Sequence, residues 1–381
     1  MDFSLSDHHL LIRDTVRDFM HTEVRPHVKD WERTDHFPLG AIQKLGALGC
    51  CGMLLPEEWG GPGLDALSYV LMLEEVAKVH AAMATAISVT NSAVQTPLLA
   101  YATPEQKSRY LRRLATGEIL GAFCLTEPAA GSDAAGIKSL AVRSGEQYTL
   151  NGTKTWVTNG SAAGLFIVFA KTDPTAAGKG ITAFLLEPNT PGLKIGRHED
   201  KMGQRSSPSV ELILDNCIVP ASARLGEEGQ GLKIALSALE NGRIGIAALA
   251  VGLAQGALEE SVKYARARRA FGKSIGEFQA IQWMLADMHT ELEAARALVY
   301  QAAHLKDSGG KMGSAGSRAK LYATEMANRV VYKAVQIHGS LGYSRESEVE
   351  RMYRDARVLT IYEGTSEIQR TIIARDLLAK F

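Results

Sequence analysis

A single carboxylate near the C-terminal end of the chain has the surroundings that a general base needs. Residues 361–370 read Ile-Tyr-Glu-Gly-Thr-Ser-Glu-Ile-Gln-Arg, which places Glu363 between the aromatic Tyr362 and the flexible Gly364. Glycine allows the backbone to turn sharply and to approach a ligand closely. A carboxyl group beside apolar neighbours has a raised pKa, which suits proton abstraction near neutral pH. Glu363 is therefore the first candidate for acid–base chemistry.

The spacing of two polar residues predicts a helix start just after this carboxylate. Ser366 and Gln369 fit a capping box, so a helix should begin near Glu367. Glu363 would then project from a connection instead of from a solvated helix face. A plainer interpretation stays open, because a loop glutamate beside a well-capped helix is the commoner case for such a segment taken alone.

The chain that must position this carboxylate has an ordinary globular composition. Its 381 residues suggest two or three domains, and 46% are hydrophobic and 22% charged. Lys and Arg number 42, as do Asp and Glu, which argues against nucleic acid or an anionic membrane as a partner. The histidines lack metal-ligand spacing, so no metal is expected. The cysteines form no CxxC pair, which indicates a reducing compartment; they are Cys50, Cys51, Cys124 and Cys217.

The sequence predicts neither a targeting segment nor a membrane span. Residues 1–7 have the features of neither an Arg-rich transit peptide nor a basic-then-apolar signal. The longest uncharged run, residues 244–258, is too short to cross a bilayer and suggests a buried helix with close neighbours. We expect a cytoplasmic protein in a bacterium, or a mitochondrial matrix protein if a transit peptide has been removed from a eukaryotic chain.

The apolar pattern changes twice along the chain and divides it into three predicted domains. Residues 1–120 show helical spacing, residues 121–225 contain β-rich runs punctuated by prolines, and helical spacing returns over residues 226–381. The predicted fold class is α+β multidomain, with an N-terminal helical domain, a middle antiparallel β-domain and a C-terminal four-helix bundle.

Two local patterns support this division. In the middle domain, Asn151 and Gly152 stand between two β-like segments, residues 147–150 and 154–157, and predict a hairpin turn. In the C-terminal domain, apolar residues from Phe278 to Ala302 recur at steps of three and four, as along the seam of a helical bundle. A second apolar face follows over residues 327–337.

Five segments, in order along the chain, resemble the signatures of the acyl-CoA dehydrogenase family. They are residues 123–133 (Phe-Cys-Leu-Thr-Glu-Pro-Ala-Ala-Gly-Ser-Asp), 156–160 (Trp-Val-Thr-Asn-Gly), 268–272 (Arg-Arg-Ala-Phe-Gly) with Gln279, 336–343 (Gln-Ile-His-Gly-Ser-Leu-Gly-Tyr) and 361–370. They are distributed in family order from residue 123 to residue 370, and five matches in register are far more specific than any one alone. The chain looks most like the short-chain and short-branched-chain members.

The resemblance implies an FAD-dependent enzyme that converts an acyl-CoA into a trans-2-enoyl-CoA. In this family a base removes the pro-R α-proton, the β-hydrogen leaves as a hydride to flavin N5, and electrons pass to an electron-transfer flavoprotein. Glu363 matches the family base, and its backbone N–H is expected to bind the thioester oxygen. Flavin oxidase or monooxygenase chemistry on the same fold is the alternative.

Some family members carry the base elsewhere, in a segment that resembles residues 239–243. The corresponding position here is Gly242, which has no side chain. Glu240 stands two residues earlier and should face a different direction on a helix, so it is better explained as a surface or CoA-side contact.

The resemblance also assigns the contacts of the cofactor and substrate. Those expected at FAD are Phe123, Leu125, Thr126, Gly131, Ser132, Trp156, Val157, Thr158, Arg268, Phe271, Gln279, Gln336, Ile337, His338, Gly339, Ser340, Thr365, Ser366 and Glu367. Those expected at the acyl-CoA are Ser132, Glu240, Asn241, Gly242, Arg243, Tyr362 and Gly364. Two plainer interpretations stay open, namely that Trp156 is a core aromatic of a strand and that the basic residues at 266–269 are a solvated helix end.

The same resemblance implies an oligomeric state and a class of substrate. Residues 336–340 are expected to reach FAD from a neighbouring chain, which implies a homotetramer built as a dimer of dimers. In the glutaryl-CoA branch an arginine pairs with the distal carboxylate, whereas residues 81–99 here contain no Arg or Lys and Ala84 occupies that place. We therefore expect a neutral, short or branched acyl-CoA, as in fatty acid β-oxidation or branched-chain amino acid catabolism.

Overall fold

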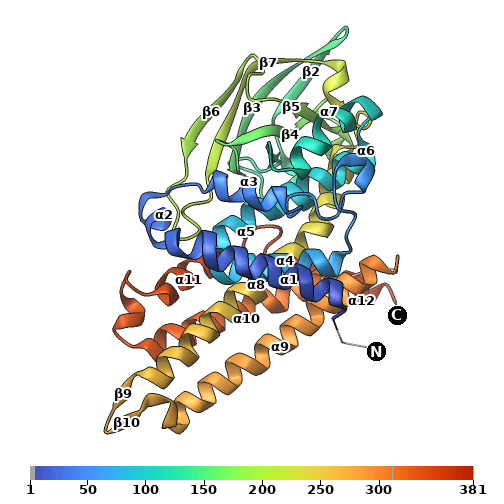
Figure 1. The fold of residues 1–381 in the computed structure, drawn as a ribbon. Coiled ribbons are helices and arrows are strands. Elements are labelled where there is room, and N and C mark those ends of the chain that lie inside the picture. The colour runs from blue at the N-terminus through green and yellow to red at the C-terminus, as the bar shows by residue number, and fades with distance from the viewer. Residues whose placement is uncertain (1–4, 311, 381) are drawn as a thin grey trace.

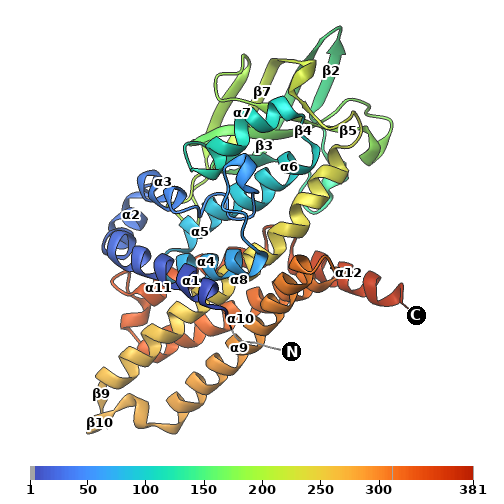
Figure 2. The same cartoon turned by 45° about the vertical axis from the view of Figure 1, so that its right-hand side comes forward.

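The structure is a computed structural model that describes residues 5–310 and 312–380. A β-sheet lies at one end of the molecule, long helices lie at the other, and the N-terminal helices lie between them (Figure 1). The longest helix, α8 (Gly231–Ala267), runs diagonally from the sheet to the far tip of the helical end (Figures 1 and 2). The predicted fold class, helical N- and C-terminal parts around a middle β part, is confirmed.

The regular secondary structure described over residues 5–119 is entirely helical. Its main elements are α1 (Asp7–Phe19), η1 (Met20–Val24), η2 (Arg25–His27), α2 (Val28–Thr34), α3 (Leu39–Ala47), η3 (Glu57–Trp59), α4 (Ala66–Val79), α5 (Ala81–Ser88), η4 (Val89–Gln95), α6 (Thr96–Tyr101) and α7 (Pro104–Ala115). Side chains mark several of the starts, since Asp65 caps α4, and Thr103 forms a capping box with Gln106 on α7. Helix α4 is buried along almost its whole length because it packs against α1, α8 and α9 (Gln279–Asp307).

The middle part is one sheet of eight strands in the order β6-β7-β3-β2-β4-β5-β8, with β1 beside β4. The strands are β1 (Leu120–Cys124), β2 (Leu140–Ser144), β3 (Gln147–Thr158), β4 (Ala163–Lys171), β5 (Ile181–Leu186), β6 (Leu193–His198), β7 (Ser209–Pro220) and β8 (Arg224–Leu225). Most pairs are antiparallel, as predicted, but β4 runs parallel to β1 and at one residue to β2. Alternate residues of β4 enter two different cores, so both faces of the sheet are covered.

The hairpin predicted at Asn151 and Gly152 is wrong. Strand β3 continues through both residues, and the turn lies instead at residues 145–146, between β2 and β3. The pairing of β3 with β7 shifts by a residue at this point, which marks a bulge. A Cβ atom at Gly152 would collide with Ser139, so the glycine permits close packing inside a strand.

The C-terminal part is a helical bundle around α10. Its elements are α8, β9 (Arg269–Ala270), β10 (Lys273–Ser274), η8 (Ile275–Glu277), α9, α10 (Ala315–His338), η9 (Leu341–Tyr343), α11 (Glu348–Ala356), η10 (Arg357–Thr360) and α12 (Ser366–Leu378). The predicted seam is buried from Met288 to Ala302 on α9, and Ile281 and Leu285 at its start are partly buried. On α10 the predicted face, Ala327 to Ile337, is buried as well.

Helix α8 is the one described helix that is long and apolar enough to cross a membrane by composition. Its 37 residues exceed the uncharged run that the sequence suggested. However, 67% of its most apolar stretch is buried inside the protein, against α4 and α10. Its glycines allow this contact, since a Cβ at Gly252 would collide with the Glu74 carbonyl and one at Gly256 would lie 2.5 Å from the Lys78 carbonyl oxygen. The prediction of a buried helix with close neighbours is confirmed.

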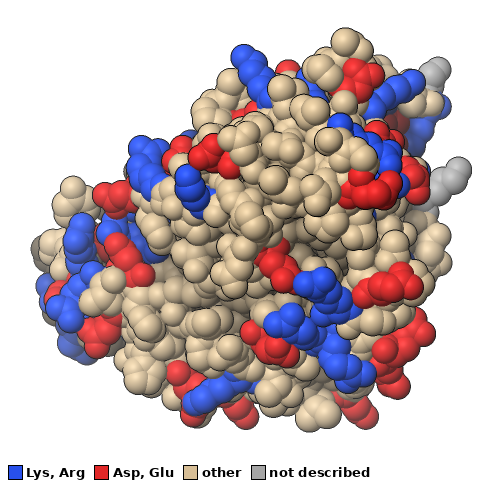
Figure 3. All heavy atoms as spheres, turned by 90° about the horizontal axis from the view of Figure 1, so that it is seen from above, with Lys and Arg blue, Asp and Glu red and all other residues tan. Residues whose placement is uncertain are grey.

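Surface charge follows the balanced composition. On the face seen in Figure 3, one cluster of Lys and Arg side chains at the lower right is bordered by Asp and Glu, and elsewhere basic and acidic side chains are interspersed. No group of three or more potential metal ligands occurs among the described residues.

Two helical glycines provide a matched test of this packing. Gly252→Ala should destabilise the protein by about 1–3 kcal/mol, because the added methyl group has no room beside α4. Gly40→Ala in α3 should be neutral or stabilising by up to about 1 kcal/mol, because no atom lies within 4 Å of the new Cβ. Thermal unfolding of both variants measures the difference, and equal melting temperatures would contradict the close approach of α8 to α4.

Candidate active site

Glu363 lies in the connection between η10 and α12, before the helix, as predicted. Its backbone is left-handed, with φ +55°, which costs a non-glycine residue about 1–3 kcal/mol. Helix α12 begins at Ser366, and its N-cap is Thr365, whose side chain accepts a hydrogen bond from the Ile368 N–H at 3.3 Å. The predicted capping box of Ser366 with Gln369 is therefore wrong, and the N-cap lies one residue earlier, at Thr365.

Three hydrogen bonds hold the connection in place. Gln369 Nε2 donates to the carbonyl oxygens of Glu363 and Gly364 at 3.2 and 2.9 Å, which explains why this side chain does not close a capping box. Lys320 Nζ on α10 donates to the Gly364 carbonyl at 2.8 Å. Both donor side chains are fully buried. Lys320 is part of this site, although no spacing in the sequence distinguishes it from other helix lysines.

The Glu363 carboxyl group lies over the bare backbone of Gly242 on α8. A Cβ atom at Gly242 would be 2.5 Å from Glu363 Oε2 and 2.9 Å from Oε1, so any side chain there would displace the carboxylate. Side chains at residues 242 and 363, the two alternative positions for the base, would therefore occupy the same space, so only one of them can carry a carboxylate. Glu240 is exposed, as expected for a residue on a different face of α8.

Burial raises the pKa of Glu363 to about 7, against the opposing charges of Arg243 and Lys320. The residue as a whole is partly exposed, but Oε2 is buried and has no hydrogen-bond partner. Burial also lowers the pKa of Lys320 to about 8. A carboxyl group with a pKa near the working pH can take up and release a proton readily, which is the property of a general base.

Two other polar groups at this point lack protein partners. Arg243 Nε is buried and unpaired, and no acceptor among the described residues bonds the Glu363 backbone N–H. Buried polar groups are almost always satisfied, so the buried, unpaired Arg243 Nε together with the buried, unpaired Glu363 Oε2 indicates a ligand site. Of the predicted substrate residues, Gly242 and Arg243 of α8 thus lie beside Tyr362 to Gly364, whereas Glu240 is exposed on another face of the helix.

A second group of predicted residues lies at the edge of the sheet. The Thr155 N–H donates to the Thr126 carbonyl at 2.9 Å and joins the end of β1 to β3. Trp156 is 57% exposed with φ +59°, so its interpretation as a core aromatic is wrong. A bulky residue held exposed in a left-handed conformation indicates a functional constraint, and a flat aromatic face fits the ring system of a flavin. Thr158 ends β3 nearby.

The remaining predicted residues of this part differ in exposure. Phe123, Leu125 and Val157 belong to the cores of the sheet, whereas Gly131 and Ser132 lie on an exposed loop.

A buried ion pair stabilises the backbone at this edge of the sheet. Lys154 on β3 is fully buried, and its Nζ lies 2.7 Å from Glu127 Oε1 and 3.3 Å from the Leu125 carbonyl. Burial would raise the pKa of Glu127, but Lys154 and the N–H groups of Lys138 and Ser139 hold it below its usual value. The pair fixes the backbone of Leu125, one of the predicted flavin contacts.

A third group lies at the far tip of the bundle, remote from the sheet (Figure 1). Arg268, Phe271 and Gln279 surround β9 and β10, and Phe271 is 96% exposed with φ +51°. The rings of Tyr264 and His338 stack with centroids 4.4 Å apart, which brings the predicted residues 336–340 to the same end of the bundle. One protomer therefore does not bring this group together with Trp156.

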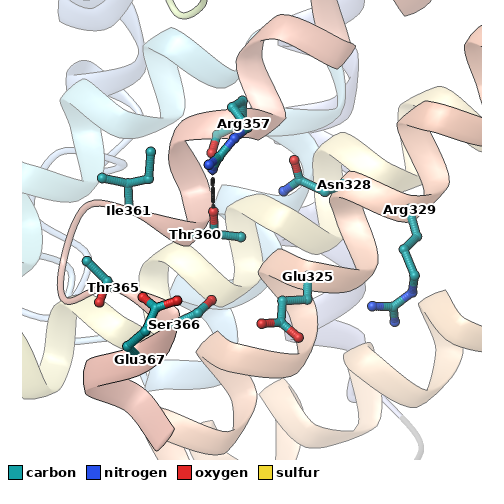
Figure 4. Close-up of a pocket in the computed structure, with 9 residues that line it drawn as sticks. All are labelled: Glu325, Asn328, Arg329, Arg357, Thr360, Ile361, Thr365, Ser366 and Glu367. Carbon is teal, nitrogen blue, oxygen red and sulfur yellow. Dashed lines mark hydrogen bonds between the residues drawn. The ribbon is translucent and has the colours of Figure 1, made fainter.

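A cavity of about 460 Å³ lies between α10, η10 and the start of α12, and Ile361 and Thr365 contribute to its lining (Figure 4). Its lining residues come from α10, η10 and the start of α12 and are Glu325, Asn328, Arg329, Arg357, Thr360, Ile361, Thr365, Ser366 and Glu367. Three of them, residues 365–367, are predicted cofactor contacts. The Arg357 guanidinium donates to Thr360 Oγ1 at 2.8 Å at its rim, and Asn328 is anchored to the Ala356 carbonyl. Sequence reasoning missed the α10 and η10 residues because no local pattern relates them to residues 365–367.

The chain matches three family models that together span most of its length. They are the N-terminal domain of acyl-CoA dehydrogenase over residues 6–118, the middle domain over residues 122–217 and the C-terminal domain over residues 229–378. The chain therefore belongs to the acyl-CoA dehydrogenase family, whose members are FAD-dependent enzymes that act on CH–CH groups. The family and cofactor predictions are confirmed.

Individual relatives are similar over nearly their full length. The short-chain specific acyl-CoA dehydrogenase of Clostridium acetobutylicum is 43% identical, over 98% of this chain and 99% of the relative. The caffeyl-CoA reductase–Etf complex subunit CarC of Acetobacterium woodii is also 43% identical, over 98% of this chain and 99% of the relative. The structure of butyryl-CoA dehydrogenase from Megasphaera elsdenii superposes with a TM-score of 0.97 at 43% identity, over 99% of this chain and 100% of that one.

Replacing Lys320 should move the pH dependence of flavin reduction by substrate to higher pH. Its positive charge lowers the pKa of Glu363, so removing that charge raises the pKa above about 7, and the reactive carboxylate then forms only in more alkaline solution. Lys320→Gln keeps a donor for the Gly364 carbonyl, whereas Lys320→Met removes charge and donor together. Stopped-flow reduction across a pH series should show midpoints raised by about one unit in both variants. An unchanged midpoint in Lys320→Gln would show that this charge does not act on Glu363.

Proposed function

We propose that this protein catalyses the α,β-dehydrogenation of a short, neutral acyl-CoA to a trans-2-enoyl-CoA, with Glu363 as the base. Glu363 takes the α-proton onto a carboxylate oxygen, and the electron pair of that Cα–H bond becomes the second bond between Cα and Cβ. The β-hydrogen leaves with its own electron pair as a hydride, and the FAD that Leu125, Thr126, Trp156 and Thr158 would hold would supply the acceptor for it. The observation that carries the proposal is the unpaired carboxylate over Gly242, with its pKa raised to about 7.

The same connection supplies a group for the thioester. The Glu363 backbone N–H has no acceptor among the described residues, and its left-handed conformation is held by Gln369 and Lys320. We assign this N–H to the thioester oxygen, where it would stabilise the negative charge that builds up as the α-proton leaves. Because the donor is fixed in advance by buried hydrogen bonds, little reorganisation is needed during the reaction.

The segment that carries a pairing arginine in the glutaryl-CoA branch supports a neutral tail here. Ala84 on α5 is fully buried, and residues 81–99 supply no cation that could pair with a distal carboxylate. An unpaired carboxylate in such a place would carry a large desolvation cost. A short-chain preference is supported by the short-chain specific relative and by the butyryl-CoA dehydrogenase structure. Fatty acid β-oxidation and branched-chain amino acid catabolism are the pathways proposed on this basis.

The remaining proposals concern assembly and partners. We assign the flavin rings to Leu125, Thr126, Trp156 and Thr158 of one protomer. The adenosine half is assigned to Arg268, Phe271, Gln279 and residues 336–340 of a neighbour, because one protomer separates the two groups. A homotetramer, a dimer of dimers, would meet this requirement. The proposed domains are residues 1–120, 121–225 and 226–381, and the proposed compartment is the cytoplasm of a bacterium or the mitochondrial matrix.

An electron-transfer flavoprotein is the proposed redox partner, as the name of the Acetobacterium relative suggests. That relative is a reductase, so the direction of the reaction depends on the potential of the partner rather than on the base. A flavin oxidase would instead pass electrons to oxygen directly.

Glu363→Gln should keep FAD bound and the fold intact but slow flavin reduction by butyryl-CoA by about 10²–10⁴-fold, because the amide cannot accept the α-proton. Glu58→Gln, on the exposed surface of η3, is the matched control and should react like the unmodified protein. Anaerobic mixing followed by flavin absorbance measures the rate. Normal reduction of Glu363→Gln would transfer the base role elsewhere, and rapid oxygen uptake by the reduced unmodified enzyme would favour an oxidase.

Valeryl-CoA and glutaryl-CoA provide a matched pair of substrates, since they have five-carbon acyl groups and differ in a terminal methyl group or carboxylate. Catalytic efficiency with an artificial electron acceptor should be more than about 100-fold higher for valeryl-CoA, because the pocket would leave the carboxylate unpaired. Isobutyryl-CoA and butyryl-CoA in the same assay measure the tolerance for branching. Comparable rates for the matched pair would contradict the assignment of a neutral tail.

A further inference from the structure

The hydroxyl group of Tyr362, next to the proposed base, is held by two side chains that no sequence motif indicates. Thr85 Oγ1 lies 3.2 Å from the Tyr362 hydroxyl, and Gln204 Nε2 lies 3.5 Å from it. Thr85 Oγ1 in turn donates to Gln204 Oε1 at 2.7 Å. The three polar groups therefore form a closed ring of hydrogen bonds.

The direction of each bond in this ring follows from the available protons. Threonine has one hydroxyl proton, and it is given to Gln204 Oε1, so Thr85 must accept the proton of Tyr362. The Tyr362 oxygen then accepts from Gln204 Nε2, which also donates to the Asp355 carbonyl at 3.3 Å. Burial raises the pKa of Tyr362, so its hydroxyl keeps the proton that it donates. Every donor in the ring then has an acceptor, and one orientation of the Tyr362 hydroxyl provides all of these hydrogen bonds.

Three distant segments of the chain supply the ring and its support. Thr85 lies on α5, and Gln204 lies in the connection over residues 199–208 between β6 and β7. The Gln204 N–H donates to Asp355 Oδ1 of α11 at 2.5 Å, and its backbone is left-handed, with φ +49°. The Arg351 guanidinium lies 3.2 Å from the other oxygen of Asp355. A left-handed, buried glutamine with this many fixed partners is a rigid anchor rather than a mobile loop residue.

By holding Tyr362, the ring of hydrogen bonds fixes the orientation of the peptide group between Tyr362 and Glu363. The Tyr362–Glu363 peptide group carries the Glu363 N–H, which is unpaired among the described residues. Rotation of the tyrosine would tilt this plane and move the carboxylate that follows it. On the other side, Gln369 and Lys320 fix the two following carbonyl groups. The connection is thus clamped at both ends, and the ring is the clamp on the N-terminal side.

We propose that Thr85 and Gln204 are positioning residues for the reaction, which aim the Glu363 carboxylate and N–H by holding the Tyr362 hydroxyl. The proposal rests on the proposed role of Glu363 as the base. Neither residue touches the reacting atoms, so their effect passes through Tyr362. Loss of the ring should therefore lower the rate of proton abstraction while leaving FAD bound.

Thr85→Val tests this, because valine keeps the shape of threonine but cannot accept or donate a hydrogen bond. On the FAD-loaded enzyme at saturating butyryl-CoA, we expect the rate constant of flavin reduction to fall about tenfold. Thr85→Ser, which keeps the hydroxyl, should stay within about twofold of the unmodified enzyme. The melting temperature and FAD content of both variants are measured in parallel. A loss that serine does not rescue would indicate a packing role and would overturn the proposal.

A double-mutant cycle with Tyr362→Phe decides whether the effect passes through the tyrosine. Tyr362→Phe should itself slow flavin reduction about tenfold, and adding Thr85→Val to it should change the rate by less than about twofold. Effects that multiply would mean that Thr85 acts independently, which overturns the proposal. If the unmodified enzyme is not reduced by butyryl-CoA or the other acyl-CoA esters, the proposed function itself fails, so the two failures are distinguishable.

Discussion

One unpaired carboxylate over the bare backbone of Gly242 sets the requirements for the rest of the structure. A buried carboxyl group without a partner is costly, and here the cost is reduced by two cations, Arg243 and Lys320, that approach without neutralising it fully. The absence of a side chain at residue 242 creates the space, and the left-handed backbone of Glu363 points the side chain into it. Stability favours a Glu363 carboxylate that is fully neutralised, whereas proton abstraction requires one that is unpaired. The surrounding residues balance these two requirements.

That balance explains why so many rigid elements converge here. Lys320 and Gln369 fix the carbonyl groups of Glu363 and Gly364, and the ring of Thr85, Gln204 and Tyr362 fixes the residue before the proposed base. Residues with left-handed backbones recur at the edge of the sheet and at the tip of the bundle, in Trp156 and Phe271, where flavin contacts are proposed. Strain of this kind persists only where neighbouring contacts hold it. Three of the eight left-handed non-glycine residues among the described residues lie at proposed binding surfaces, namely Trp156, Phe271 and Glu363, and others such as Asp35 and Asn216 lie elsewhere.

The sequence could predict what depends on local spacing or on complete motifs. The helical seams, most strands, the position of Glu363 before a helix and the family itself all followed from such patterns. Two local predictions were wrong for the same kind of reason, namely that contacts with residues outside the local motif decided the structure. Asn-Gly usually makes a turn, but close packing against Ser139 uses Gly152 inside a strand, and Gln369 bonds the Glu363 connection instead of the helix N-terminus. Lys320 could not be found, because its bond to Gly364 joins residues 44 positions apart.

The separation of the predicted cofactor residues is itself a physical argument about assembly. Trp156 lies at the edge of the sheet, whereas Arg268 and Phe271 lie beyond the far end of α8, a helix of 37 residues. Asn159, three residues after Trp156, bonds the Ala86 carbonyl of α5, and α5 packs against α8 at Gly245. At 1.5 Å rise per residue, the 23 residues from Gly245 to Arg268 span roughly 35 Å and separate the two groups. If both groups bind the same FAD, the second must belong to another copy of the chain. The exposed ring of Phe271 is then explained as a surface that is covered only on assembly, and the length of α8 becomes the feature that makes the cofactor a shared one.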